Sequence, residues 1–366
     1  MNTAPLILLA AGGTGGHLFP AEALGVELMK RGMRVRLATD SRALRYSGLF
    51  SKETIDVVPS ETMRGRSPLS LARTGMMLAA GTAVALNLMR RLKPAAVVGF
   101  GGYPTLPPLL AARLFGIPTV IHDSNAVLGR ANRFLSGGVS AIATSLPGVL
   151  DRDAALAAKT TTTGTPMRPA ILAAAAVPFA APEPDGPLRL LVVGGSQGAR
   201  VMSDIVPPAI ERLHPALWRR LKLVQQVRDE DMTRVRAVYD GLKLDAELAP
   251  FFADLPARLA TSHLVISRSG AGTVAELGAV GRPSILVPLP GSIDQDQFAN
   301  AGVLLDAGGA IRITQGDFTP DRLAAELAGL AAEPARLTAM AAGARTVGKL
   351  DAAEQLADLV AKVAGI

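Results

Sequence analysis

The sequence predicts an α/β protein with two domains, each holding a parallel sheet, and two observations carry this prediction. A short apolar strand that runs into a glycine-rich turn and then into helical sequence occurs twice, as LILLAAGGTGGH at Leu6–His17 and as LLVVGGSQGAR at Leu190–Arg200. Each such unit is typical of one Rossmann-like domain. The length of 366 residues also exceeds the usual size of a single core. We therefore expect two Rossmann-like domains that face each other across a cleft.

Apolar runs separated by helix-length segments predict the individual strands, because parallel strands need such crossovers. In the first half these runs lie at Leu6–Ala10, Arg34–Thr39, Ala95–Gly99, Thr119–His122 and Ala141–Thr144. In the second half they lie at Leu188–Val193, Leu223–Val227, Leu264–Ser267, Ser284–Val287 and Ile311–Thr314. Helical spacing followed by a glycine predicts two helices of the first half, at Ala21–Arg31 and Pro107–Phe115.

The boundary between the domains is predicted by a change in composition. Residues 163–187 are rich in proline and alanine, which indicates a linker between a first domain at 1–162 and a second at 188–347. Asp351–Val363 has the pattern of an amphipathic helix. The C-terminal segment of about 348–366 can pack back on the first domain or cap the second, and the sequence leaves both open.

Composition excludes several classes of protein. Hydrophobic residues make up 49% and charged residues 19%, which is ordinary for a globular chain. The absence of cysteine excludes a disulfide scaffold, a thiolate zinc site and a cysteine nucleophile. The four histidines (His17, His122, His214, His263) are scattered without metal-ligand spacing, so we expect no metal site. Met1 leads directly into the first strand, so we also expect no secretory signal.

Charge is distributed unevenly between the halves. Residues 1–168 carry a net charge of +10 and residues 169–366 of −3, within the total of +7. A basic half predicts contact with an anionic surface or substrate, although variation of the surface alone can also give such asymmetry. Thr74–Met89 is an uncharged run that is too short and too interrupted for a spanning helix. It is flanked by basic residues, among them Arg64, Arg66, Arg73, Arg90 and Arg91.

Two interpretations of this run remain open. Thr74–Met89 predicts a helix that faces the core of the first domain. The same basic and apolar patch, Arg64–Arg91, can also rest on an anionic membrane leaflet, with its arginines at the headgroups and Met76, Met77 and Leu78 at the acyl boundary.

The first glycine-rich turn, Gly12–His17, lets backbone N–H groups approach a ligand, and the helix after it offers its positive end to an anion. A dinucleotide fingerprint fails here because Leu18 occupies its third glycine position. Asp40, at the end of the second strand, keeps the oxidoreductase alternative open. His17 has two interpretations. It takes part in the chemistry at the mouth of the predicted cleft, or it is a loop histidine without a role. His122 and Asp123 end another strand and form an acid/base pair.

Three further turns carry polar residues. Ser196, in Gly194–Ala199, predicts a diphosphate cradle without the lysine of a P-loop. Ser267–Glu276 again joins a strand to a helix, and Glu276 can bind a ribose diol or act as a capping-box residue. Gln297 follows a strand and can bind sugar hydroxyls, or it belongs to a solvated loop. The turn Gly99–Pro104 also follows a strand. It either lines the ligand site or is a tight turn that packs under a helix.

Six motifs in order make the chain similar to the GT-B glycosyltransferases of family 28, and more narrowly to the MurG family. The motifs are GGTGGHLFPA (Gly12–Ala21), GFGGYPTLP (Gly99–Pro107), HDSNAVLGRANR (His122–Arg133), TGTPMR (Thr163–Arg168), GGSQGAR (Gly194–Arg200) and SRSGAGTVAEL (Ser267–Leu277). The resemblance covers nearly the whole chain. It implies a GT-B fold and transfer of N-acetylglucosamine from UDP-GlcNAc to lipid I, the lipid-linked muramyl-pentapeptide precursor of peptidoglycan, which gives lipid II. It implies no cofactor and no nucleic-acid partner, and a peripheral place on the cytoplasmic face of the inner membrane.

The resemblance also implies roles for residues at matching positions. The donor sugar and diphosphate would lie against Thr14, Gly15, Gly16, Asn125, Arg168, Ser196 and Gln197. The segment Gly270, Ala271, Gly272 and Thr273 would hold the diphosphate, with Glu276 on the ribose and Gln297 on sugar hydroxyls. Phe252 falls where the family contacts uracil through the backbone. The catalytic candidates are His17 as the base, and His122 with Asp123 as the alternative.

The chain departs from the family pattern at three places. His122-Asp123-Ser124-Asn125 stands where the family commonly has H-E-Q-N, so the Asp123 carboxylate reaches one methylene less far. Asp296 precedes Gln297 where glutamine or histidine is common. Gln225-Gln226-Val227-Arg228 replaces the usual H-Q-x-G strand end, so the role of that loop is open.

The resemblance implies a single in-line displacement that inverts C1 of the sugar, and closure about the linker that excludes water. Helix N-termini at Gly195–Ala199 and Gly270–Thr273 can stabilise the departing UDP without a metal. Another GT-B enzyme, such as a UDP-GlcNAc 2-epimerase or a lipid A disaccharide synthase, is the main alternative. A two-domain oxidoreductase and a non-enzymatic basic binding protein follow it.

Overall fold

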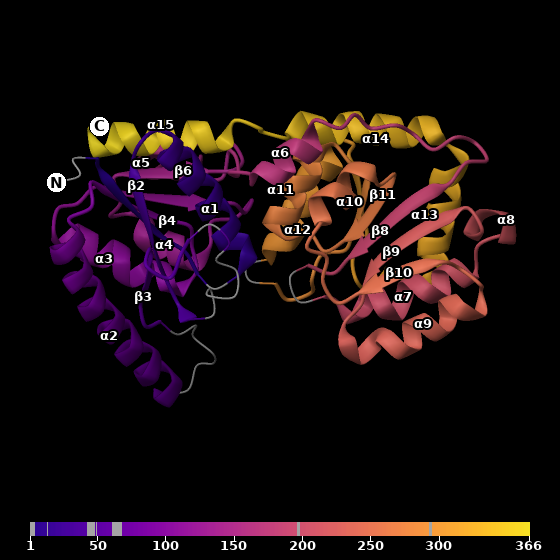
Figure 1. Ribbon diagram of the computed structural model, residues 1–366, viewed down its shortest axis with the longest axis horizontal. Coiled ribbons are helices and arrows are strands. Elements are labelled where there is room, and N and C mark those ends of the chain that lie inside the picture. Colours follow the sequence, from indigo (N-terminus) through magenta and orange to yellow (C-terminus); the bar gives the residue numbers. More distant parts are fainter. Residues whose placement is uncertain are drawn as a thin grey trace. The chain divides into compact units, whose positions relative to one another are not determined.

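A computed structural model describes residues 4–12, 14–41, 48, 50–60, 68–195, 198–292 and 295–366. The chain divides into two compact units, which are described separately here. Unit 1 comprises residues 1–168 and 349–366, and unit 2 comprises residues 169–348. Each unit holds one parallel sheet with helices on it (Figure 1). This confirms the predicted α/β class with parallel sheets.

The sheet of unit 1 has the strand order β3-β2-β1-β4-β5-β6-β7, and every described pair is parallel. Its strands are β1 (Leu6–Ala10), β2 (Arg34–Thr39), β3 (Ile55–Val57), β4 (Ala96–Gly99), β5 (Thr119–Asp123), β6 (Ala141–Thr144) and β7 (Thr160–Thr162). Its helices are α1 (Gly15–Lys30), α2 (Pro68–Leu92), the 3-10 turn η2 (Tyr103–Thr105), α3 (Leu106–Leu114), α4 (Arg130–Ser136), α5 (Ala154–Ala157) and α15 (Ala352–Ala364).

Helices cover both faces of this sheet, which explains why its central strands are apolar runs. Ile7 and Leu9 of β1 belong to the cluster that includes residues of α1 and α15. Leu8 and Ala10 belong to the cluster formed with α2, α3 and α4. Alternate residues of one strand therefore fill two separate layers of core.

The C-terminal helix α15 packs on α1 of unit 1. Its Leu356 and Val360 are fully buried in the core of unit 1. Arg31, at the end of α1, donates to the Asp358 carboxylate over 2.6 Å. Just before α15, Lys349 Nζ donates to the Thr162 carbonyl over 3.1 Å. Residues 349–366 accordingly form part of unit 1.

The sheet of unit 2 has the strand order β10-β9-β8-β11-β12-β13 and is also parallel. Its strands are β8 (Leu188–Val193), β9 (Leu221–Gln226), β10 (Ala246–Ala249), β11 (Leu264–Ser267), β12 (Ser284–Leu286) and β13 (Ala310–Arg312). Its helices are α6 (Pro169–Ala175), α7 (Arg200–Glu211), α8 (Pro215–Trp218), the 3-10 turn η3 (Asp229–Asp231), α9 (Met232–Gly241), α10 (Leu255–Thr261), α11 (Ala271–Val280), α12 (Asp296–Asp306), α13 (Pro320–Ala332) and α14 (Pro334–Val347).

Two elements differ from the sequence-based expectation. Helix α1 begins at Gly15, six residues before the predicted start at Ala21, and contains Pro20. His17 therefore lies in the first turn of a helix and not in the loop before it. The segment 163–187, predicted as a linker, contains helix α6, which packs on α10 and α11 of unit 2.

Helix α2 has one packed face and one exposed apolar face. Ala85, Leu88 and Met89 are buried against the core of unit 1, as predicted for a core-facing helix. Met76 is 67% exposed and Val84 is 43% exposed. Among the helices of the described residues, none combines the length and hydropathy needed to cross a membrane.

Candidate functional site

The two glycine turns of unit 1 lie side by side and enclose the ring of His17. Strands β1 and β4 are neighbours, and the Gly12 N–H of the first turn donates to the Gly101 carbonyl of the second over 3.2 Å. Gly101 and Gly102 adopt φ angles of +90° and +79°, which favour glycine. A Cβ atom at Gly101 would lie 3.3 Å from His17 Cε1. The second turn therefore leaves room for the imidazole, in addition to packing under a helix.

The environment of His17 keeps its ring neutral near pH 7. Burial lowers the pKa of His17 below its ordinary value of 6.5, because it disfavours the charged form. The negative charge of Asp123 and a hydrogen bond with the Phe100 backbone act in the opposite direction and are smaller. A neutral imidazole can accept a proton, and the nearby carboxylate favours the imidazolium that results.

His122, the second histidine of unit 1, is only 1% exposed. Its Nε2 lies 2.9 Å from the Gly164 carbonyl, so Nε2 carries the proton and donates it there. The Ser145 hydroxyl lies 3.4 Å from the same nitrogen, and the Phe100 ring lies 5.5 Å away between centroids. Burial lowers the pKa of His122 as well. These contacts tie His122 to the last strands of unit 1.

Asp123 organises the loop that follows β5. One carboxylate oxygen accepts from the backbone and side-chain nitrogens of Asn125 over 3.0 and 3.2 Å. The other accepts from the Gly129 N–H over 2.8 Å and from Asn132 Nδ2 over 2.9 Å. Asp123 is 3% exposed. Its acceptors are therefore occupied by the chain, and they hold Asn125 in a defined position.

The remaining sequence-predicted residues of unit 1 lie around the start of α1. Thr14 is the N-cap residue and is exposed, Gly15 is buried and Gly16 is exposed. Arg168 places its guanidinium 3.8 Å from the centre of the Phe19 ring. The structure therefore brings Arg168 to the same helix that carries His17.

The glycine turn after β8 is the corresponding feature of unit 2. A Cβ atom at Gly194 would lie 2.1 Å from the Ala199 nitrogen, so this position admits only glycine without opening the turn. The Gly194 N–H donates to Gln226 Oε1 over 2.9 Å. The Gly198 N–H donates to the Gly195 carbonyl over 3.1 Å. The predicted residues Ser196 and Gln197 lie outside the described residues.

The second predicted anion site of unit 2 is the start of α11. Gly270 is the N-cap residue, and Ala271, Gly272 and Thr273 form the first turn, all half-buried. Glu276 is half-buried and lies in the second turn of the helix. The capping-box alternative for Glu276 is therefore wrong, because that role belongs to the third residue after the N-cap.

Gln297 and Phe252 complete the predicted set. Gln297 accepts from the Leu289 N–H through Oε1 over 3.0 Å, and its carbonyl accepts from the Ser269 hydroxyl over 2.8 Å. Gln297 is thus half-buried and joined to the segment before α11, which differs from a fully solvated loop. The Phe252 ring is 7% exposed and lies 4.4 Å below the Arg258 guanidinium, so its backbone remains the part that a base can contact.

Three helices that follow glycine turns, α1, α7 and α11, have starts that suit an anion. No acidic residue lies in the first turn of α1, α7 or α11, and no side chain caps any of them by a hydrogen bond. Their backbone N–H groups and positive dipole ends therefore suit an anionic ligand. Across the part of the chain that the structure describes, no group of three or more histidine, aspartate or glutamate side chains could hold a metal ion.

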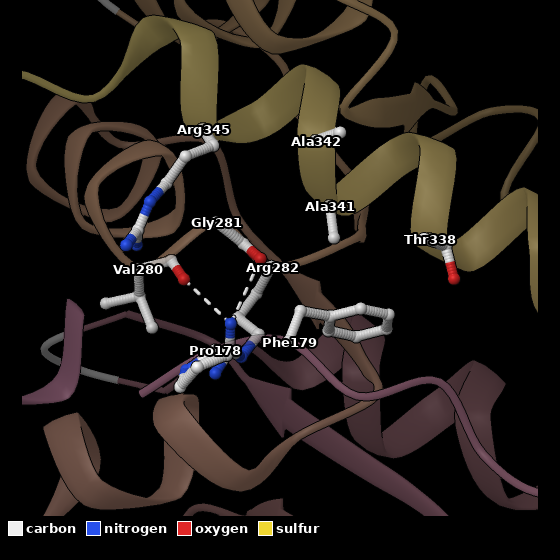
Figure 2. A pocket seen from close by; sticks show the side chains of 9 residues that line it. All are labelled: Pro178, Phe179, Val280, Gly281, Arg282, Thr338, Ala341, Ala342 and Arg345. Carbon is white, nitrogen blue, oxygen red and sulfur yellow. Dashed lines mark hydrogen bonds between the residues drawn. The ribbon is translucent and has the colours of Figure 1, made fainter. Parts of the chain in front are cut away.

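A pocket of about 260 Å³ lies elsewhere in unit 2, at the C-terminal end of α11 (Figure 2). Arg282 beneath it donates to five carbonyls. These carbonyls lie at the ends of α10 and α11 and just after α6, so helix dipoles balance the buried charge. A helix of 10 residues is about 15 Å long. The pocket is therefore separate from the predicted anion site at the start of α11.

Sequence reasoning missed the roles of two buried amide side chains. Asn132 of α4 donates both to the His122 carbonyl and to Asp123, and it lies within a motif that the sequence shows. Gln226 lies in the strand end whose role was left open. The partners of Asn132 lie nine and ten residues before it in the same motif, whereas those of Gln226 come from distant segments and leave no local signal.

Comparison with known proteins identifies the family. Residues 7–144 match the N-terminal domain of glycosyltransferase family 28, and residues 189–356 match its C-terminal domain. The UDP-N-acetylglucosamine--N-acetylmuramyl-(pentapeptide) pyrophosphoryl-undecaprenol N-acetylglucosamine transferase of Nitrobacter hamburgensis is 82% identical, over 100% of this chain and 98% of its own length. The transferase of the same name from Rhodopseudomonas palustris is 81% identical, over 100% and 98%.

A solved structure agrees with these relatives. The crystal structure of Acinetobacter baumannii MurG superimposes with a TM-score of 0.78 at 30% sequence identity, and covers 98% of this chain and 99% of that chain. This likeness confirms the expected GT-B fold class. The chain therefore belongs to glycosyltransferase family 28 and, within it, to the MurG family.

Proposed function

We propose that this chain transfers N-acetylglucosamine from UDP-GlcNAc to the C4 hydroxyl of the lipid-linked muramyl-pentapeptide acceptor, with inversion at C1. The observation that carries the proposal is the identity of about 80% over the full length with transferases whose names state this donor and this acceptor. Side-chain placement in both units is compatible with it. An epimerase, an oxidoreductase or a plain binding protein is supported by no comparable observation.

In this proposal unit 2 binds the donor. The diphosphate lies against the helix starts of α7 and α11, which present N–H groups and carry neither an acid nor a capping side chain. Glu276, in the second turn of α11, accepts from the ribose hydroxyls. Phe252 contacts uracil through its backbone, and Gln297 binds sugar hydroxyls. The same N–H groups stabilise the negative charge that develops on UDP as it leaves.

Unit 1 binds the acceptor and supplies the base, and we assign that role to His17. Its imidazole is half-buried and neutral near pH 7, and Asp123 provides a negative charge that stabilises the imidazolium. His122 is the weaker candidate, because its Nε2 proton is committed to the Gly164 carbonyl and its ring is 1% exposed. His122 and Asp123 then act by positioning Asn125 and the loop around it.

The reaction is a single displacement. The acceptor C4 oxygen forms a bond to C1 of the sugar while the bond from C1 to the diphosphate oxygen breaks. The proton of the C4 hydroxyl passes to His17, and the electron pair of the broken bond leaves with UDP. Attack from the face opposite UDP converts the α-linked donor into a β-linked product.

We propose further that unit 1 docks peripherally on the anionic cytoplasmic face of the inner membrane through α2 and neighbouring residues. The exposed Met76 and Val84 supply apolar surface, and Arg73 and Arg90 are exposed on the same helix. Arg91 contributes less charge than the sequence indicated, because Asp56 pairs with it over 2.7 Å. Arg64 and Arg66 lie outside the described residues.

A transfer assay tests the activity. Labelled UDP-GlcNAc is incubated with the chain and either the lipid-linked muramyl-pentapeptide or the same lipid without the muramyl group. We expect label in the lipid fraction only with the muramyl acceptor. Label that stays in UDP-GlcNAc under both conditions would contradict the proposal.

A paired-charge experiment tests the docking. Arg73→Glu with Arg90→Glu should reduce turnover of a long-chain lipid acceptor more than turnover of a short soluble analogue, because only the former requires the surface. Arg219→Glu with Arg336→Glu is the matched control, since both are exposed arginines of unit 2 and the change in charge is the same. Equal losses on both acceptors, or the same effect from the control, would contradict membrane docking.

A further inference from the structure

We propose that Gln226 is a positioning residue that holds the diphosphate turn and the base-contacting segment of unit 2 at a fixed spacing. Neither the family match nor the names of the relatives assign it a role. The inference deepens the proposed function, since it concerns the same donor site and rests on that function.

The position of Gln226 follows from the topology of the sheet. Strand β9 lies between β8 and β10, and Gln226 is its last residue. The loops that leave β8 and β10 at this edge therefore pass on either side of the Gln226 side chain. The first begins with Gly194, and the second begins with Pro250 and leads to Phe251 and Phe252.

The carboxamide of Gln226 joins these two loops directly. Its Oε1 accepts from the Gly194 N–H over 2.9 Å, and its Nε2 donates to the Pro250 carbonyl over 3.1 Å. One planar group thus fixes a backbone donor of the first loop relative to a backbone acceptor of the second. The next residue adds a parallel connection, because the Val227 N–H donates to the Ala249 carbonyl over 3.0 Å.

Because Gln226 is buried, the loss of these two hydrogen bonds should be costly. Gln226 is 6% exposed and Gly194 is buried, so water replaces a lost acceptor poorly at this place. Gly194 is also the point at which the turn packs closest, with Ala199 directly above it. A shift of the Gly194 backbone therefore moves the start of α7, where we place the diphosphate.

A nucleoside diphosphate must contact both loops at once. Its diphosphate lies at the glycine turn and its base at the segment around Phe252, so its affinity depends on their spacing before binding. Fixing that spacing in the free protein reduces the ordering that binding requires. Gln226 touches neither the ligand nor the reacting atoms and acts through the two backbones.

The preceding residue, Gln225, provides a matched comparison on the same strand. Its Oε1 accepts from the Tyr239 hydroxyl over 2.5 Å, and its Nε2 donates to the Met202 carbonyl over 3.4 Å. Gln225 is fully buried and binds Tyr239 of α9 and Met202 in the first turn of α7, but it bonds neither Gly194 nor Pro250, the two loop residues that Gln226 joins. Loss of its amide should therefore affect stability but not the spacing of the donor loops.

The experiment compares Gln226→Met with Gln225→Met in the full chain, because methionine keeps the length of the side chain and removes its hydrogen bonds. Calorimetry gives the Kd for UDP, and steady-state kinetics give KM for UDP-GlcNAc and kcat. For Gln226→Met we expect Kd and KM to rise about tenfold, or about 1.4 kcal/mol, with kcat within about threefold. For Gln225→Met we expect a lower Tm and a Kd for UDP within about twofold of the wild type.

Two results would overturn the inference: an unchanged Kd for UDP in Gln226→Met, or equal weakening of UDP binding in both variants. Gln226→Asn keeps the amide but shortens it by one methylene, and it serves if Gln226→Met does not fold. We expect it also to weaken UDP binding, since it cannot reach both loops, and wild-type affinity would overturn the inference. If the wild type itself binds no UDP, the proposed function fails, which is a different result from a failure at Gln226.

Discussion

Replacement of His17 by alanine should reduce turnover while leaving donor binding intact. The ring occupies the space between two glycine turns of unit 1, where its pKa is lowered below 6.5. With a pKa at or below 6.5, about three quarters or more of the molecules hold a neutral imidazole at pH 7. Removal of a general base from this position should lower kcat by roughly 10²–10⁴, the usual contribution of such a group.

The pH profile separates this role from a structural one. In the wild type, kcat/KM should fall as the pH decreases through a value below 6.5, because protonated His17 cannot accept the acceptor proton. The alanine variant should lose this acid limb and keep its affinity for UDP. His214→Ala is the control, since His214 is an exposed histidine of unit 2. Turnover within threefold of the wild type, or an acid limb that persists unchanged in His17→Ala, would refute the assignment.

The remaining predictions concern unit 2. Gly194→Ala should weaken UDP binding by more than tenfold and lower the unfolding free energy by about 1–3 kcal/mol, because its Cβ would lie 2.1 Å from the Ala199 nitrogen; calorimetry and denaturant titration measure both, and wild-type values would contradict it. Glu276→Gln should raise KM for UDP-GlcNAc, because the ribose hydroxyls lose their acceptor. A donor with 2′-deoxyribose should then bind the variant no worse than the normal donor does. If the variant still prefers the ribose donor as strongly as the wild type, the ribose contact is excluded. Burial and the charges of Arg189 and Arg282 lower the pKa of His263 from 6.5 to about 4. The unfolded chain then binds more protons between these values, so the stability that neutral His263 provides above pH 6.5 should be lost progressively down to about pH 4, by roughly 2–3 kcal/mol. His263→Gln should flatten that part of the pH dependence of Tm, and an unchanged slope would contradict it.

The strands that could be predicted from the sequence lie at other places in the sheets than the strands that could not. Central strands such as β1 and β4 are covered on both faces and appear as uninterrupted apolar runs, and in β8 only Arg189 interrupts the run. The three strands without such a signal are β3, β7 and β10, and each lies at an edge of its sheet. Edge strands are short and partly exposed, so TTT at Thr160–Thr162 and AELA at Ala246–Ala249 look like loop sequence.

Helix α1 shows a second limit of local patterns. Glycines and Pro20 near its start are residues that usually break helices, yet the helix begins at Gly15. Packing of Leu18, Ala21 and Leu24 on the sheet outweighs these unfavourable propensities. The consequence concerns the proposed base, because His17 lies in the first turn of this helix.

Some parts of the candidate site could likewise be predicted from the sequence, and others could not. The glycine turns, the starts of α7 and α11 and the position of His17 could be located from the sequence, because a strand, a glycine turn and a helix follow one another locally. The separate environments of His17 and His122 could not, since they depend on Gly101 and Gly164 from other segments. The two-sided bonding of Gln226 likewise requires three neighbouring strands, and spacing along the chain gives no indication of it.

The anomeric configuration of the product tests the central claim most directly. Lipid-linked muramyl-pentapeptide is converted with UDP-GlcNAc that carries ¹³C at C1, and NMR of the product gives the configuration at the new linkage. A single displacement predicts a β linkage, formed only when the muramyl acceptor is present. An α linkage, or release of UDP at the same rate without the acceptor, would contradict the account.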